Sequence, residues 1–146
     1  MQQESNPTKN GGNAVGIMIL SNSPVHRGDI IVHPKTSGWG SHYGTGVDGG
    51  FVAHTTPDLG KHVGTLEEFA SGLPCAILHP RRTDCDSDAV QQRALWDLGR
   101  PYNTVIANCE HDTTFAQTGV ASSPTLNGLL AVVMITGLCK LISEGR

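Results

Sequence analysis

Three side chains of this sequence have the chemistry of a nucleophilic site: Cys109, His42 and His54. A cysteine reacts as a thiolate, and a helix N-terminus favours the thiolate because its unpaired N–H groups and its dipole stabilise negative charge. A neighbouring imidazole accepts the thiol proton, and a third polar group holds that imidazole in orientation. These residue types predict nucleophilic catalysis at a thiol, provided that the fold brings them together.

The local sequence around Cys109 predicts the required helix N-terminus. Asn108 is a favourable N-cap, and Cys109 would be the first residue of a helix that runs to about Thr118. Gly119 follows as a C-cap, because glycine readily adopts the left-handed conformation that ends many helices. Backbone N–H groups of the first turn would also provide an oxyanion hole beside the thiol.

The two histidines are expected on adjacent strands of one β-hairpin. Residues 42–47 and 51–54 are predicted strands, and the Asp-Gly-Gly sequence at 48–50 between them is a strong hairpin signal. Glycine accepts the positive φ that such turns need. His42 and His54 therefore belong to one small structural unit.

Other segments predict an α+β chain in which a small antiparallel sheet packs against helices. Thr65 and Glu68 fit a capping box, which predicts a short helix after Thr65. Apolar runs, helical spacing and capping residues predict further strands at 15–20, 30–32 and 75–79, and helices at 84–99 and from 123 onward.

Length and composition are those of one globular domain, with 146 residues of which 38% are hydrophobic and 16% charged. The formal net charge is -3, and the only tight basic cluster is Arg81-Arg82, so nucleic acid is not favoured as a partner. The four cysteines form no C-x-x-C pair, which favours free thiols in a reducing compartment.

No cofactor and no metal ion are expected. His33, His42, His54 and Cys109 are residue types that bind zinc, but they show neither C-x-x-C nor H-x-x-x-H spacing. A zinc site built from them is kept as an alternative to a thiol site.

Short motifs follow one another in a defined order along residues 28–123. His42 lies in the block SHYGTGV, His54 ends the block FVAH 12 positions later, and residues 108–111 are N-C-E-H. This combination resembles the lecithin:retinol acyltransferase family, which includes small phospholipase A/acyltransferase enzymes. The layout, with a following apolar segment, is similar to a viral branch of that family, the H-box/NC-type 2A proteins of picornaviruses such as kobuviruses and parechoviruses.

The resemblance implies a circularly permuted, papain-like fold of the NlpC type and a role for each matching residue. Cys109 would be the nucleophile, His42 the general base and His54 the residue that orients the base. The residues that would shape the helix start are Asn108, Glu110 and His111. In cellular members of the family, the cysteine forms an acyl-cysteine thioester from a phospholipid or another ester.

The viral branch implies a non-structural 2A-type protein that acts in genome replication or assembly, in the host cell cytoplasm or at membrane-associated replication sites. It would act through host or viral protein partners or through a membrane, with a Cys-His site that no longer catalyses. Two features favour this loss: no apolar lid is evident between the histidines, and Asp112 would oppose thiolate formation if it faced Cys109. An active thiol-dependent phospholipase or acyltransferase is the alternative, and a cysteine protease is a third hypothesis.

The chain is expected to have three parts. Residues 1–14 are a polar, flexible tail, residues 15–123 form the acyltransferase-like H-box/NC domain, and residues 124–146 form a C-terminal apolar helix. The unbroken apolar run of that helix extends only from Leu129 to Ile135. A membrane span needs about 20 apolar residues. Three interpretations stay open: a core or docking helix, a membrane-associating helix and a full span.

Overall fold

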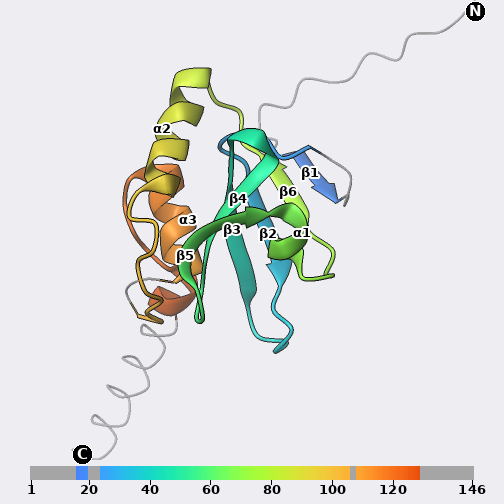
Figure 1. The fold of residues 1–146 in the computed structure, drawn as a ribbon, viewed down its shortest axis with the longest axis vertical. Coiled ribbons are helices and arrows are strands. Elements are labelled where there is room, and N and C mark those ends of the chain that lie inside the picture. The colour runs from blue at the N-terminus through green and yellow to red at the C-terminus, as the bar shows by residue number, and fades with distance from the viewer. Residues whose placement is uncertain (1–15, 20–23, 106–107, 129–146) are drawn as a thin grey trace, which may run out of the picture.

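The computed structural model describes the backbone of residues 16–19 and the full structure of residues 24–105 and 108–128. Over these residues the fold is α+β, as predicted, with one antiparallel sheet of six strands in the order β1-β6-β2-β3-β4-β5 (Figure 1). The strands are β1 (Gly16–Ile19), β2 (Ile30–Pro34), β3 (Ser41–Val47), β4 (Phe51–Thr56), β5 (Gly60–Thr65) and β6 (Ala76–His79). The helical elements are η1 (Asp48–Gly50), α1 (Leu66–Ala70), α2 (Asp84–Leu95) and α3 (Cys109–Thr118).

Helices cover the sheet on both sides. Helices α2 and α3 lie together beside β3 and β4, and α1 lies on the other side of the sheet (Figure 1). Successive side chains of a strand point to opposite faces, so Val52 joins the core beneath α1 while Ala53 joins the core beneath α2 and α3. The first core contains Phe69 of α1 and Ile31 of β2. Cys109, at the start of α3, therefore belongs to the same layer as α2.

Local signals placed two helices correctly. Thr65 and Glu68 form the predicted capping box at the start of α1. Helix α3 begins at Cys109 behind the N-cap Asn108, and it ends at Gly119, whose φ of 79° is left-handed.

The prediction that the helix at 84–99 continues to Gly99 is wrong, because α2 ends at Leu95. Trp96 is extended, and its carbonyl oxygen accepts a hydrogen bond of 2.6 Å from Lys61 Nζ. The backbone N–H of Gly99 donates to the carbonyl oxygen of Lys61 over 2.7 Å. Residues 96–100 therefore bind to the start of β5 instead of continuing the helix.

The sequence pattern also missed strand β5. Its residues GKHVGT include two glycines and a lysine, which are uncommon in strands. The strand forms because it pairs with β4, and because Lys61, only 2% exposed, forms an ion pair of 2.8 Å with Asp97. Tertiary pairing thus outweighs the weak strand propensity of the segment.

The hairpin that carries the two histidines is confirmed. Strands β3 and β4 are joined through η1, where Gly49 and Gly50 have φ values of 80° and 78°. Residues 124–128 are helical after Pro124, as predicted. The predicted tail at 1–14 and the rest of the predicted helix at 124–146 lie outside the described residues. Within the described ranges, no helix is long and apolar enough to cross a membrane.

Candidate functional site

The residues expected to carry chemistry line one pocket of about 350 Å³. His42 of β3, His54 of β4 and Cys109 of α3 all face it, together with the apolar side chains of Phe69 and Tyr102. Cys109 is far from the two histidines along the chain, and the packing of α3 against β3 and β4 brings it close to them. The fold therefore brings together the three candidate site residues.

His42 and His54 are joined by a hydrogen bond of 3.0 Å between Nε2 of His42 and Nδ1 of His54. Phe69 supports both rings: its centroid lies 4.9 Å from that of His42 in a stacked arrangement and 5.1 Å from that of His54 edge-on. Gly44 makes room for Phe69, because a Cβ at this position would lie 2.9 Å from Phe69 Cε2 and 2.4 Å from Val52 Cγ1.

Two further histidines extend this pair into a row across four strands. His33 of β2 is the cross-strand partner of His42, with ring centroids 5.2 Å apart. His62 of β5 is the partner of His54, with centroids 4.2 Å apart. We call His33, His42, His54 and His62 the histidine row. Sequence reasoning treated His33 only as a residue type and missed His62, because β5 was not predicted.

The environment of the row keeps its central imidazoles neutral. Burial, followed by the charges of neighbouring histidines, lowers the pKa of His42 from 6.5 to about 4. The same causes lower the pKa of His54 from 6.5 to about 3. Both rings are therefore neutral at pH 7, because desolvation disfavours the positively charged imidazolium.

The hydrogen bond between His42 and His54 restricts which ring nitrogen can act as a base. For Nδ1 of His42 to accept a proton, its Nε2–H must donate to Nδ1 of His54, which leaves a hydrogen on Nε2 of His54. Among the described residues, that buried Nε2 has no hydrogen-bond partner. In the opposite arrangement the same nitrogen is an unpaired acceptor, so the hydrogen bond couples the tautomers of the two rings without selecting one of them.

Cys109 occupies the predicted helix start, but the expected stabilisation of its thiolate is outweighed. The backbone N–H groups of Tyr43 and Glu110 lower the pKa of Cys109, while burial is the larger effect and raises it. In the part of the chain that the structure describes, no hydrogen bond joins the thiol to His42 or His54. The net effect raises the pKa of Cys109, so at neutral pH the resting form of this side chain is the thiol.

The other predicted site residues stabilise α3. Asn108 Oδ1 accepts hydrogen bonds of 3.0 Å from the backbone N–H groups of Glu110 and His111. The Glu110 carboxylate accepts hydrogen bonds from the hydroxyls of Ser123 and Thr125, and so holds the chain that leads into residues 124–128. Nδ1 of His111 is buried, and no partner for it is found among the described residues.

Asp112 does not face the thiol. Its buried carboxylate accepts hydrogen bonds from the Thr55 hydroxyl and from the Arg100 guanidinium. The carboxylate therefore ties α3 to β4 and to the segment that follows α2. The sequence-based expectation is that Asp112 would oppose a thiolate if it faced Cys109, and the carboxylate points to Thr55 and Arg100 instead.

We expect the free energy of unfolding to fall as the pH is lowered from about 7 to about 5, because both histidine pKa values lie below 6.5 in the folded state. The unfolded chain then binds more protons, so this stability is complete above pH 6.5 and is lost below it. The slope is up to about 1.4 kcal/mol per pH unit for buried His54, and smaller for half-buried His42.

Urea unfolding at a series of pH values measures this slope. His54→Gln should flatten it, because this variant removes the imidazole whose pKa is lowered most, to about 3. An equal slope in the unmodified chain and in His54→Gln would contradict the burial effect.

Comparisons with known proteins identify no relative of this chain. The sequence matches no protein-family model, and no curated protein sequence matches it. The case for a family is therefore carried by the motifs and by the arrangement of Cys109, His42 and His54.

Proposed function

We propose that this chain is a non-structural viral protein of the 2A type that acts in genome replication or assembly by binding a protein partner or a membrane. Its Cys109 pocket would be a binding pocket that does not turn over substrate. The observation that carries the proposal is the state of the site: a buried thiol of raised pKa has no hydrogen bond to the neighbouring neutral imidazole within the described residues.

We also propose that the fold is the circularly permuted papain-like arrangement. Two features support this assignment. A cysteine begins a helix that packs on an antiparallel sheet, and adjacent strands of that sheet carry the two histidines. Both histidines precede the cysteine in the chain, as in the family that the motifs resemble.

An active thiol-dependent phospholipase or acyltransferase is the second candidate, favoured by the hydrogen bond between His42 and His54 and by the orientation of Asp112. In that reaction the Cys109 sulfur would bond to the carbonyl carbon of an ester while the thiol proton moves to His42. The alcohol would leave with that proton, and the acyl-cysteine thioester would pass its acyl group to water or to another acceptor.

Iodoacetamide alkylation of the folded chain, followed over pH by mass spectrometry, distinguishes the two candidates. Cys85 is exposed and serves as a reference within the same molecule. We expect Cys109 to react more slowly than Cys85 at neutral pH, because burial raises the pKa of the Cys109 thiol and also limits the access of the reagent to it. His42→Gln should not change the Cys109 rate.

The opposite result would support catalysis. Rapid alkylation of Cys109 with a midpoint below about pH 7, lost in His42→Gln, would reveal a thiolate–imidazolium pair. Incubation with phospholipid vesicles gives a second readout, since an acyl adduct on Cys109 would show turnover and would overturn the binding proposal. Cys109→Ser is the control for that adduct.

A further inference from the structure

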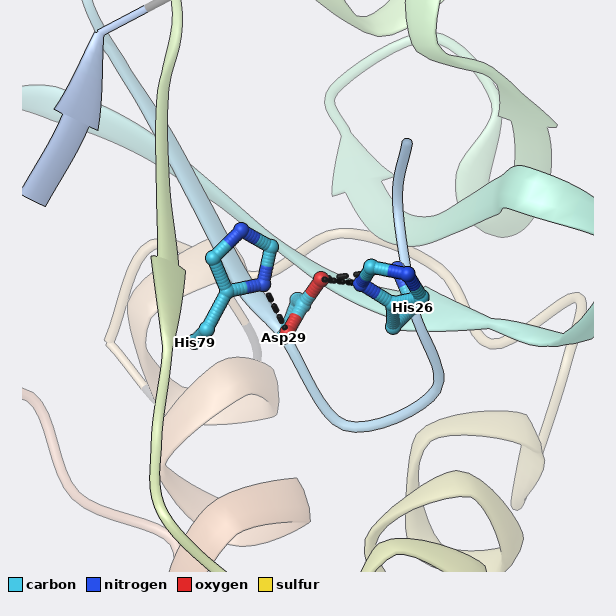
Figure 2. Close-up of side chains that lie close together, drawn as sticks. All are labelled: His26, Asp29 and His79. Carbon is cyan, nitrogen blue, oxygen red and sulfur yellow. Dashed lines mark hydrogen bonds and ion pairs between the residues drawn. The ribbon is translucent and has the colours of Figure 1, made fainter. Parts of the chain in front are cut away.

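A second cluster of ligand-type side chains lies outside the Cys109 pocket. His26, Asp29 and His79 each offer one donor atom, and these atoms lie within 4.8 Å of one another. Figure 2 shows the Asp29 carboxylate between the two imidazoles, with one oxygen turned toward each ring. Nδ1 of His79 is 2.8 Å from Oδ1 of Asp29, and Nδ1 of His26 is 3.6 Å from Oδ2 of Asp29.

Strand pairing and a tight turn create this cluster from residues far apart in sequence. Strand β2 pairs with β6 so that Ile30 lies opposite Leu78, and one step further along the register Asp29 faces His79. His26 is brought back by a turn in which the backbone N–H of Asp29 donates to the His26 carbonyl oxygen over 3.1 Å. The backbone N–H of His26 donates in return to Oδ2 of Asp29 over 2.7 Å.

We propose that His26, Asp29 and His79 bind a zinc ion. Two imidazole nitrogens and a carboxylate oxygen are ligands that zinc prefers, whereas calcium and magnesium prefer sets made entirely of oxygen. Zinc–ligand bonds of about 2.0–2.2 Å in a tetrahedron place ligand atoms roughly 3.3 Å apart. The three donor atoms already lie within 4.8 Å of one another, so a small movement of the side chains brings them to that spacing. His26 is 64% exposed, so its ring can move inward and the fourth position remains open to water.

The surrounding charges fit a single divalent cation. Asp29 is buried and keeps its carboxylate oriented through the His26 backbone N–H, as ligating carboxylates are commonly held. Arg27 is turned to Asp48 and Asp88, at 3.6 and 2.7 Å. Arg82 interacts electrostatically with Asp29 and so acts against zinc, although its guanidinium donates a hydrogen bond to Gln117. A nitrogen that binds a metal carries no hydrogen, so on zinc binding Nδ1 of His79 gives up the hydrogen that it donates to Asp29.

Isothermal titration calorimetry of the full chain with zinc chloride tests this site. We expect one zinc per chain at this cluster, and at least about a tenfold weaker affinity in His79→Gln and in His26→Gln. The exposed position of His26 makes His26→Gln a variant that keeps the fold. His42→Gln is the matched control and should bind as the unmodified chain does. Magnesium chloride should give no binding heat.

A cobalt(II) titration provides an independent readout, because its visible absorption reports coordination by protein ligands. Absence of zinc binding to the unmodified chain would overturn the proposal. Binding unchanged in both His26→Gln and His79→Gln would also overturn it, and loss in His42→Gln alone would place the metal in the histidine row.

Discussion

Replacing Phe69 by alanine is expected to lower the free energy of unfolding by about 3–5 kcal/mol. Phe69 is 2% exposed and fills the core between α1 and the sheet. Its ring also contacts those of His33, His42 and His54, at centroid distances of 5.0, 4.9 and 5.1 Å. The cavity left by the truncation therefore opens the apolar core and the histidine row together.

Urea unfolding measures the loss, and two variants serve as controls. Phe51→Ala removes the same side chain from a position that is 44% exposed, and should cost much less. Phe69→Leu keeps most of the volume and should cost about 1.5 kcal/mol or less. NMR titration gives a second readout: water entering the cavity of Phe69→Ala should raise the pKa values of His42 and His54 from about 4 and about 3 toward 6.5. Unchanged stability and unchanged histidine titration would contradict this role for Phe69.

Replacing Asp112 by alanine is expected to destabilise the fold by about 2–3 kcal/mol, somewhat below the ~3–5 kcal/mol of a fully buried broken ion pair. The change removes the acceptor of both the Thr55 hydroxyl and the Arg100 guanidinium. Arg100 keeps Asp97 at 3.1 Å and is partly exposed, so part of its charge stays compensated. The loss should appear in urea unfolding.

An exposed ion pair is the appropriate comparison for Asp112→Ala. Arg27 and Asp88 are 2.7 Å apart, but Asp88 is 49% exposed, and such pairs contribute at most about 1 kcal/mol. Asp88→Asn should therefore change stability much less. Equal effects of the two variants would show that burial of the Asp112 carboxylate is not what makes its pairing important.

The parts of the fold that could be predicted are those set by neighbouring residues. The N-cap Asn108, the C-cap Gly119 and the capping box before α1 each act within a few positions, so their effect can be read locally. Strand β5 and the end of α2 could not be read in this way. Both depend on Lys61, whose buried ammonium finds Asp97 and the Trp96 carbonyl only after the chain has folded.

The sequence predicted which residues form the candidate site, but it could not predict whether those residues are ionised. Residue types and spacing led to Cys109, His42 and His54, and the fold places all three on one pocket. The pKa of Cys109 results from a competition between helix-start N–H groups and burial, and only the three-dimensional packing decides it. His33 and His62 join the site through strand register, which requires knowing which strands pair.

Glu110 gives the first turn of α3 a mechanical connection to the end of the described chain. Its carboxylate holds the Ser123 and Thr125 hydroxyls, and its charge raises the pKa of the adjacent Cys109. A ligand that pulls the helix at 124–128 away from α3 must break these hydrogen bonds and leave the carboxylate free to move. Thermodynamic linkage then requires the reverse effect: a change in the charge of Cys109 alters how tightly that helix is held, so the thiol and the C-terminal helix report on each other.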